Sequence, residues 1–299
     1  MTSRKWTAQD LPSLENCTFV ITGANSGIGL AAARALGHAG AHVVLAVRDT
    51  SRGAQAAASI QGRPEVRQLD LADLASVQAF ADAWDGDLDV LVNNAGVMAV
   101  PERRTKDGFE MQIGTNHLGH FALTNLLLPK ITDRVVTVAS GAHRMGSIRL
   151  DDLNWERDSY ERWRAYGQSK LANLLFTTEL QRRLDAAGSS VRAHAAHPGW
   201  AATSLQNRTE NRLQNTLMAI GNRLIAQSAE QGALPTLYAA TQDLPGDSYV
   251  GPDGIREGRG HPTLVGRSDA ARDVETGARL WTLSEQLTGT AFPLIPAVA

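Results

Sequence analysis

The chain has 299 residues, of which 43% are hydrophobic and 20% are charged, and its formal net charge at pH 7 is -2. This apolar fraction is sufficient for a sizeable core, and with this net charge no overall basic field favours binding to nucleic acid or an anionic membrane. Cys17 is the only cysteine, no apolar run approaches the roughly 20 residues that span a bilayer, and residues 1–15 lack a signal-peptide core, so we expect a cytoplasmic protein without a disulfide or a membrane anchor.

Short apolar runs alternate with segments of helical spacing through the first two thirds of the chain. The runs predict strands at residues 17–22, 42–47, 65–69, 88–92, 134–139 and 191–196. The segments between them predict helices at residues 27–38, 54–60, 74–84, 109–128 and 164–184. Short strands separated by longer helices indicate βαβ units, and right-handed crossovers then give an α/β fold with a doubly wound parallel sheet of the Rossmann type.

The last third of the chain has a less regular pattern. Residues 204–242 have mostly helical spacing, residues 248–250 predict a short final strand, and the glycine-rich residues 251–266 predict a loop. Ser268 can cap a closing helix that ends near Leu287. No linker rich in Gly, Ser or Pro divides the chain, so we expect a single domain with a C-terminal helical elaboration.

A glycine-rich loop joins the first predicted strand to the first predicted helix. It reads Thr22-Gly-Ala-Asn-Ser-Gly-Ile-Gly29. Glycines at this place let the backbone approach a pyrophosphate, while the helix N-terminus supplies N–H donors and a favourable dipole. Three glycines alone are a weak signal, since such loops also form ordinary tight turns. Their position in the first βαβ unit favours dinucleotide binding.

The Gly-x-x-x-Gly-x-Gly spacing of this loop resembles that of the short-chain dehydrogenase/reductase family, and later segments match the family in order. They are Asp70-Leu71, Asn93-Asn94-Ala95-Gly96, Asn116, Ser140, Tyr166-Gly-Gln-Ser-Lys170, and Pro198-Gly199 with Thr203. The resemblance covers about residues 15–250, and the ordered set is highly specific.

The resemblance implies roles for these residues. The catalytic set would be Asn116, Ser140, Tyr166 and Lys170. The dinucleotide would contact Gly23, Asn25, Ser26, Gly27, Ile28, Gly29, Asp70, Leu71, Asn94, Ala95, Gly96, Tyr166, Lys170, Pro198, Gly199 and Thr203. By this resemblance, Asp70 would bind the adenine amine and Lys170 would bind the nicotinamide ribose. Ser140 would hold the substrate oxygen, and Asn116 would support a water relay to Lys170.

Within the family, the sequence is most similar to the retinol dehydrogenase-like and WW-domain oxidoreductase-like branch. The similarity is carried by Asn116-His-Leu-Gly-His-Phe, Ser169-Lys-Leu-Ala-Asn173 and Leu237-Tyr-Ala-Ala-Thr241. Ser140 and Tyr166 are 26 positions apart. Many family members have a shorter separation, and this branch carries a similar insertion.

The ordered motifs also suggest how the domain is divided. Within one domain of residues 1–299, we expect a core at about 15–250 and a C-terminal extension at about 251–299. Residues 204–229 follow the turn where the family covers its substrate, so we predict a mobile substrate lid there. Its apolar stripe is Leu213, Leu217, Ile220 and Leu224. Ordinary core packing is the alternative for this stripe.

The residues themselves also support proton transfer. Tyr166 and Lys170 are four positions apart, so a helix places both on one face. A free phenol ionises at about pH 10, and we expect the ammonium of Lys170 to favour the phenolate and lower the pKa of Tyr166. With the resemblance, this implies an oxidoreductase that interconverts a carbonyl and an alcohol by hydride transfer. An apolar aldehyde, ketone or secondary alcohol is the expected substrate.

The end of the second strand predicts NADP(H) as the preferred cofactor over NAD(H). An acidic residue there would accept from the adenosine ribose hydroxyls and repel a 2′-phosphate, but this chain has Val47. Arg48 follows, and its guanidinium can bind a phosphate in bidentate fashion. Arg52 could add charge, and Asp49 could pair with either arginine. A solvated loop arginine is the alternative interpretation of Arg48.

The same residues bear on two other functions, dinucleotide sensing without catalysis and metal binding. A non-catalytic dinucleotide sensor or scaffold on this fold is the alternative, although the complete catalytic set favours an enzyme. His117 and His120 have a spacing found in metal sites, but no cysteine or acidic cluster joins them, so we expect no metal. The expected partner is a small-molecule substrate, with no nucleic acid, and the chain is compatible with a homo-oligomer.

Overall fold

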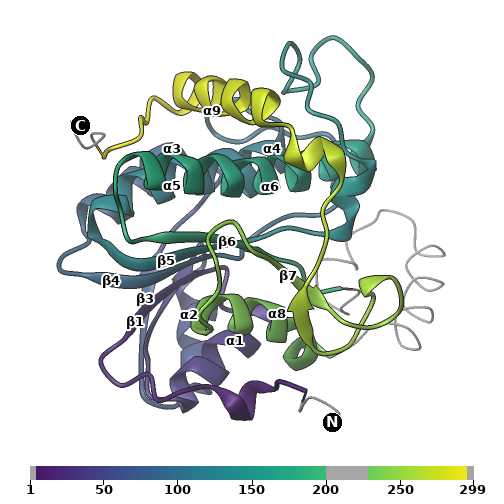
Figure 1. Cartoon of the computed structure of the whole chain (residues 1–299). Helices are drawn as coiled ribbons and strands as arrows, with labels where there is room; N and C mark the ends of the chain where they lie inside the picture. The colour runs from purple at the N-terminus through teal and green to yellow at the C-terminus, as the bar shows by residue number, and fades with distance from the viewer. Residues whose placement is uncertain (1–4, 200–227, 295–299) are drawn as a thin grey trace, which may run out of the picture.

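One mixed sheet organises the part of the chain that the computed structural model describes, residues 5–199 and 228–294 (Figure 1). Its strands are β1 (Thr18–Thr22), β2 (His42–Val47), β3 (Arg63–Gln68), β4 (Leu88–Asn93), β5 (Ile131–Val138), β6 (Arg192–Ala196), β7 (Tyr249–Pro252) and β8 (Pro262–Leu264). Their order in the sheet is β3-β2-β1-β4-β5-β6-β7-β8. Strands β1 to β7 pair in parallel, and only the edge strand β8 is antiparallel within these residues. The predicted α/β fold with a doubly wound sheet is confirmed.

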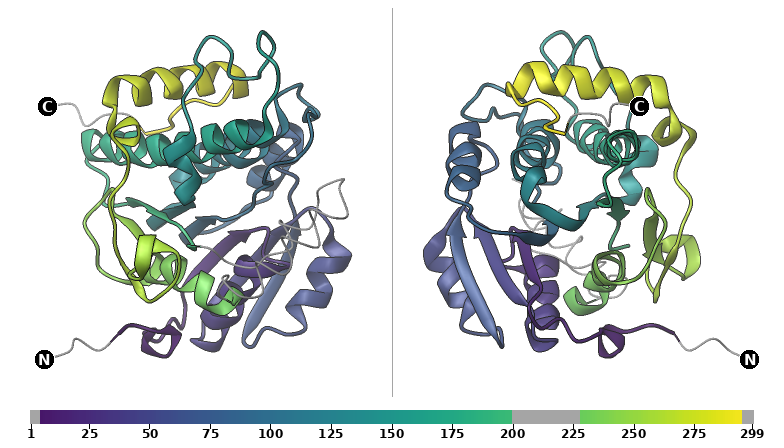
Figure 2. Two further views of the ribbon diagram at one scale, coloured as in Figure 1. Left: turned by 90° about the vertical axis from the view of Figure 1, so that its right-hand side faces the viewer. Right: turned by 60° about the vertical axis from the view of Figure 1, so that its left-hand side comes forward.

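Helices cover both faces of this sheet (Figures 1 and 2). They are α1 (Gly27–His38), α2 (Thr50–Ala57), α3 (Leu74–Asp82), α4 (Met111–Ile113), α5 (Gly119–Leu127), α6 (Arg162–Ala186), α8 (Ala229–Thr241) and α9 (Val274–Thr288). One face carries α1, α2 and α8, and the other carries α3, α5 and α6. α9 lies outside α6 as an additional layer (Figure 2).

The central strands read as continuous apolar runs because both of their faces are covered. On β1, Val20 packs toward one helical layer and Ile21 toward the other, and both are fully buried. On β2, Val43 and Val44 alternate in the same way. The residues that end these strands therefore emerge together at the carboxyl edge of the sheet.

Residues 109–128 do not form the one regular helix that the sequence predicted, because a π-helical turn separates two α-helices there. α4 is a single turn capped by Glu110, which accepts from the backbone N–H groups of Gln112 and Ile113. A π-helical turn, η2 (Gly114–Leu118), follows before α5 begins. A π-helical turn is a short interruption within a helix, so the spacing over twenty residues did not distinguish η2 from a regular α-helix.

Two predictions in the C-terminal third also need correction. Residues 251–266 are not wholly a loop, because β8 pairs with β7 along the edge of the sheet. Ser268 does not cap the closing helix, since it precedes a short 3-10 turn, η7 (Asp269–Arg272). Asp273 caps α9 instead, and its carboxylate accepts from the backbone N–H of Thr276 at 3.0 Å.

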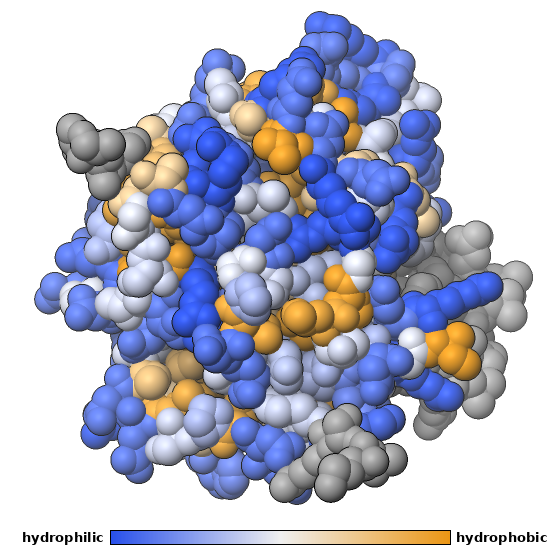
Figure 3. Space-filling model, viewed as in Figure 1, coloured by the Kyte–Doolittle hydropathy of each residue, from blue (hydrophilic) through white to orange (hydrophobic). Residues whose placement is uncertain are grey.

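Some sequence predictions fall on residues that the structure does not describe. Thr203 lies there, as does the predicted lid apart from Ser228 and Ala229, and so do the four apolar positions of its stripe. Among the helices of residues 5–199 and 228–294, none is both long enough and apolar enough to cross a bilayer. The face in Figure 3 is mainly hydrophilic, with apolar side chains gathered in small groups.

Candidate active site

The glycine-rich loop lies between the end of β1 and the start of α1. Gly23 and Gly27 have φ angles of +66° and +56°, in the left-handed region that favours glycine. A Cβ atom on Gly29 would collide with the Asn94 amide and lie 2.9 Å from the Gly23 carbonyl oxygen. Ser26 precedes the helix without capping it through its side chain. The loop therefore leaves an open backbone and a helix N-terminus that fit a dinucleotide pyrophosphate.

Thr22 joins this loop to the segment that follows β4. The Thr22 hydroxyl oxygen accepts from the backbone N–H groups of Asn94 and Ala95, each at 2.9 Å. The Asn94 side chain donates to the Thr22 carbonyl at 2.8 Å. β1 and β4 are neighbours at the point where the strand order reverses, which is where open α/β sheets bind their ligands.

Tyr166 and Lys170 lie on the buried face of α6, next to the residues after β4. The Lys170 Nζ atom lies 5.8 Å from the centroid of the Tyr166 ring and donates to the Val138 carbonyl at 3.0 Å. A Cβ atom on Gly96 would lie 3.6 Å from this Nζ atom. Lys170 has one hydrogen-bond partner among the described residues, so its ammonium retains donors that fit ribose hydroxyls.

Burial dominates the ionisation of both side chains. It raises the pKa of Tyr166 to about 12, and the Ser140 hydroxyl opposes this shift by hydrogen bonding to the phenol. It lowers the pKa of Lys170 to about 8. The expectation that Lys170 lowers the pKa of Tyr166 is therefore not met here, because desolvation of the phenolate outweighs any attraction from the ammonium.

Asn116 lies in the π-helical turn η2 and faces the residues after β4. Its side-chain oxygen accepts from the Val97 N–H at 2.8 Å, and its amide donates to the Val97 carbonyl at 2.9 Å. The same amide donates to the Ser169 hydroxyl at 2.9 Å, which ties η2 to α6. These contacts bring Asn116 to within reach of Gly96 and Lys170.

Ser140 follows β5 and precedes a 3-10 turn, η4 (Gly141–Met145). Its hydroxyl oxygen accepts from the Ala142 N–H at 3.2 Å. Its carbonyl accepts from the His143 ring at 2.7 Å. The structure thus gathers Asn116, Ser140 and the Tyr166–Lys170 pair, which come from three separate segments of the chain, at one edge of the sheet.

The residues predicted for the adenosine end lie further along the same edge. Val47 ends β2 and is buried, whereas Arg48 is exposed and bonds to no residue in the described part of the chain. Asp49 caps α2 and forms an ion pair with Arg52 at 3.5 Å. Asp70 follows β3 and accepts from the Ala72 N–H at 3.0 Å.

The turn after β6 contains Pro198 and Gly199. Gly199 has a φ angle of +66°, and a Cβ atom there would lie 2.8 Å from the Pro252 ring. His197 precedes the turn, and its ring lies 3.1 Å from the Glu257 carboxylate. This turn is thus fixed against the segment after β7, on the same edge of the sheet as the other predicted residues.

Sequence reasoning missed the role of His120 and considered it only as a metal ligand. Its ring contacts the Thr22 hydroxyl at 2.9 Å and the Asn116 carbonyl at 3.0 Å. Its neighbour His117 instead contacts the Ser284 hydroxyl of α9 at 2.9 Å. Residues 5–199 and 228–294 contain no cluster of ligands suited to a metal. Only the repeated histidine in the Asn-His-Leu-Gly-His segment could have drawn attention to this position.

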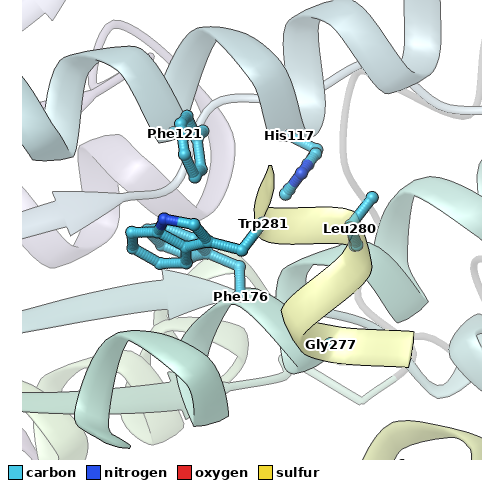
Figure 4. A pocket seen from close by; sticks show the side chains of 6 residues that line it. All are labelled: His117, Phe121, Phe176, Gly277, Leu280 and Trp281. Atoms are coloured by element: carbon cyan, nitrogen blue, oxygen red, sulfur yellow. The ribbon is translucent and has the colours of Figure 1, made fainter. Parts of the chain in front are cut away.

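An aromatic cluster lies where η2, α5, α6 and α9 meet (Figure 4). His117, Phe121, Phe176 and Trp281 surround a gap that leaves no room for a water molecule. The Phe176 and Trp281 rings stack with centroids 5.6 Å apart. This gap is a feature of the packing between α5, α6 and α9 and does not serve as a substrate site.

Comparison with known proteins gives consistent matches. The model of the short chain dehydrogenase family matches residues 18–214. The chain is 40% identical to retinol dehydrogenase 13 of Homo sapiens over 294 residues, which cover 93% of this chain and 86% of that protein. It is also 40% identical to polyprenol dehydrogenase of Mus musculus over 295 residues, covering 93% of this chain and 86% of the relative.

Solved structures show the same similarity. The crystal structure of an uncharacterized protein from Mycobacterium paratuberculosis matches with a TM-score of 0.86 and 57% sequence identity, covering 97% of this chain and 100% of that chain. A short chain dehydrogenase/reductase family protein matches with a TM-score of 0.60 and 27% identity, covering 79% of this chain and 95% of that chain.

Proposed function

Because this chain belongs to the short-chain dehydrogenase/reductase family and is an NAD(P)-dependent oxidoreductase of alcohol and carbonyl groups, we propose that it acts on an apolar aldehyde, ketone or secondary alcohol and prefers NADP(H). The observation that carries this proposal is that Asn116 and Lys170 lie beside Gly96, while the Tyr166 ring lies next to Lys170 and to the Ser140 hydroxyl. A non-catalytic dinucleotide sensor is not favoured, since the curated relatives are named as dehydrogenases.

Proton transfer is the part of the reaction assigned to the chain itself. A bound nicotinamide would exchange hydride with the substrate carbon. At neutral pH a phenol with a pKa of about 12 holds its proton, so Tyr166 suits the protonation of a carbonyl oxygen during reduction. The Ser140 hydroxyl, which acts to lower the pKa of the phenol, would orient the substrate oxygen toward it. Lys170, with a pKa of about 8, can return a proton near neutrality.

The cofactor-binding residues are proposed on the same basis. The loop residues Gly23 to Gly29 and the segment Asn94 to Gly96 would hold the pyrophosphate and nicotinamide half. Lys170 would bind the nicotinamide ribose, and Asp70 with Leu71 would border the adenine. Pro198, Gly199 and Thr203 would border the nicotinamide. The names of the relatives, retinol and polyprenol dehydrogenases, support an apolar alcohol or the corresponding carbonyl compound as substrate.

Turnover of a substrate panel tests the proposed reaction. Apolar aldehydes, ketones and secondary alcohols are assayed with NADPH, NADH and their oxidised forms, together with small polar carbonyl compounds as controls. The proposal expects turnover of at least one apolar compound, with a higher kcat/KM for NADPH than for NADH. Exclusive turnover of polar compounds would contradict the proposed substrate class.

The preference for NADP(H) depends on Arg48. Arg48 stands free next to the buried Val47, whereas Arg52 is paired with Asp49. A charge-assisted contact is typically worth about 1.5–3 kcal/mol, so Arg48→Ala should lower kcat/KM for NADPH roughly ten- to a hundredfold and change the value for NADH little. Arg52→Ala is the matched control and should have a small effect. Equal losses with both cofactors in Arg48→Ala, or a wild-type preference for NADH, would overturn the assignment.

A further inference from the structure

His120 connects the two halves of the candidate site through buried hydrogen bonds. It lies on the first turn of α5 and is 1% exposed. One ring nitrogen, Nε2, lies 2.9 Å from the Thr22 hydroxyl oxygen. The other, Nδ1, lies 3.0 Å from the Asn116 carbonyl oxygen. A single ring therefore joins the end of β1, which holds the glycine-rich loop, to the π-helical turn that carries Asn116.

The partners of His120 determine which nitrogen carries the proton. A carbonyl oxygen only accepts hydrogen bonds, so Nδ1 must donate to Asn116. In the neutral ring, Nε2 is then an acceptor. The single hydrogen of the Thr22 hydroxyl can go to this nitrogen at 2.9 Å or to the Val92 carbonyl at 3.4 Å, and the shorter contact favours His120. The lone pairs of that hydroxyl oxygen accept from the N–H groups of Asn94 and Ala95. Each donor in this series thus has one acceptor: the N–H groups of Asn94 and Ala95 donate to Thr22, Thr22 donates to His120, and His120 donates to the Asn116 carbonyl.

The environment of His120 keeps the ring neutral. Burial, as the main cause, lowers its pKa to about 4, and the positive charge of Lys170 acts in the same direction. A proton on Nε2 would face the Thr22 oxygen, so the hydroxyl hydrogen would have to turn to the Val92 carbonyl. Protonation would therefore exchange its 2.9 Å contact for one of 3.4 Å.

We propose that His120 is a positioning residue, which through its Nδ1–H orients the carbonyl of Asn116 and through its Nε2 orients the hydroxyl of Thr22. This inference rests on the proposed function, because Asn116 and the segment after β4 are assigned to catalysis and to cofactor binding. The two nitrogens have separable effects. The bond to Asn116 supports turnover, whereas the bond to Thr22 supports dinucleotide affinity through Asn94 and Ala95.

Two amide substitutions separate these effects. In His120→Asn, the side-chain amide can replace Nδ1 and donate to Asn116 but cannot reach Thr22. In His120→Gln, the longer side chain can place its amide near Thr22 but no longer matches the Nδ1 position. His120→Phe keeps the ring and loses both bonds. His194 on β6 is fully buried, and neither of its ring nitrogens has a hydrogen-bond partner within the described residues, so His194→Asn is the matched control.

Steady-state kinetics and dinucleotide titration measure the effects of these four substitutions. His120→Asn should keep kcat within about threefold of wild type and bind the dinucleotide at least fivefold more weakly. His120→Gln should show the reverse, with a kcat at least tenfold lower and near-native affinity. His120→Phe should lose both, and His194→Asn should change neither kcat nor affinity in the folded protein.

Equal losses in the Asn and Gln variants, or wild-type kcat in His120→Phe, would overturn the positioning role. Thermal denaturation identifies variants that fail to fold. If His120→Phe fails to fold, the comparison of His120→Asn with His120→Gln still tests the positioning role. Nitrogen-15 NMR of the wild-type histidines supplies a second readout and should find His120 neutral and protonated on Nδ1 between pH 5 and 8. An Nε2–H or charged ring would contradict the inference. Dinucleotide affinity and the NMR signals remain measurable if no substrate turns over. Failure of the proposed function can therefore be distinguished from failure of the positioning role.

Discussion

Burial sets the ionisation of the two residues proposed for proton transfer. Sequence spacing alone predicted that Lys170 would lower the pKa of Tyr166, because it showed their proximity and not the solvent around them. In the folded chain Tyr166 is 8% exposed and Lys170 is 4% exposed, so desolvation acts against the charged form of each. A bound oxidised dinucleotide would add the positive charge of its nicotinamide ring to that of Lys170 at this edge.

A test at the residue scale is Lys170→Met, with stability measured in the absence of dinucleotide and turnover measured in its presence. The substitution removes a buried ammonium, and the Val138 carbonyl keeps a second donor, the Asn173 amide at 3.2 Å. At pH 7 the variant should be more stable than wild type, by about 1–3 kcal/mol, while kcat falls at least a hundredfold. Chemical denaturation and turnover measure the two quantities.

The pH dependence of Lys170→Met provides its control. The folded pKa of Lys170, about 8, lies below the ordinary value of 10.5. The unfolded chain therefore binds more protons between these values, and wild-type stability gains on the variant as the pH rises. The stability advantage of the variant should be complete below pH 8 and shrink as the pH rises toward 10.5. An advantage that grows over this range would show that the buried ammonium is not destabilising.

At the scale of elements, the sequence predicted the regular βαβ units and missed the irregular ones. β1, β2 and β4 are recognisable because both of their faces are buried and their apolar runs are continuous. β8 has only three residues, of which Thr263 and Leu264 are exposed, so it has no apolar signature. The start of α9 was misplaced because Ser268 and Asp273 are both good capping residues, and tertiary packing decides between them.

Two helical glycines differ in the space around them, and a pair of alanine substitutions tests this difference. A Cβ atom at Gly29 would meet the Asn94 amide and backbone atoms of the loop, so Gly29→Ala should destabilise the fold by about 1–3 kcal/mol and weaken dinucleotide binding at least thirtyfold. At Gly277 on α9 the nearest atom is the Leu175 side chain at 3.7 Å, an ordinary contact.

Gly277→Ala is the matched substitution and should stabilise the protein by about 0.5–1 kcal/mol, because alanine restricts the unfolded chain and favours the helix. Its dinucleotide affinity should equal that of wild type. Thermal denaturation and fluorescence titration of both variants provide the comparison. If both substitutions changed dinucleotide affinity alike, the close approach at Gly29 would not be specific to the cofactor loop.

At the scale of the whole molecule, the fold explains why distant sequence motifs could be assembled into one site. The carboxyl ends of parallel strands meet at one edge, so Thr22, Asn94 and Ser140 had to lie near each other once the strand order was known. The hydrogen bonds among them were not predictable, because they depend on side chains such as His120 that no spacing rule selects. The identity of the residues at the edge was thus accessible from sequence, whereas their mutual orientation was not.

Hydride transfer in wild type and Tyr166→Phe tests the central claim most directly. Deuterium is followed by mass spectrometry from reduced, C4-labelled NADP to the carbonyl carbon of a substrate that turns over, and dinucleotide affinity is measured on the same preparations. Wild type should yield alcohol with one deuterium per molecule. Tyr166→Phe should bind the dinucleotide within about threefold of wild type and transfer deuterium at least roughly a hundredfold more slowly, as loss of a general acid requires. Transfer at a near-native rate in Tyr166→Phe, or a wild-type protein that binds the dinucleotide and labels no carbonyl compound, would contradict the account.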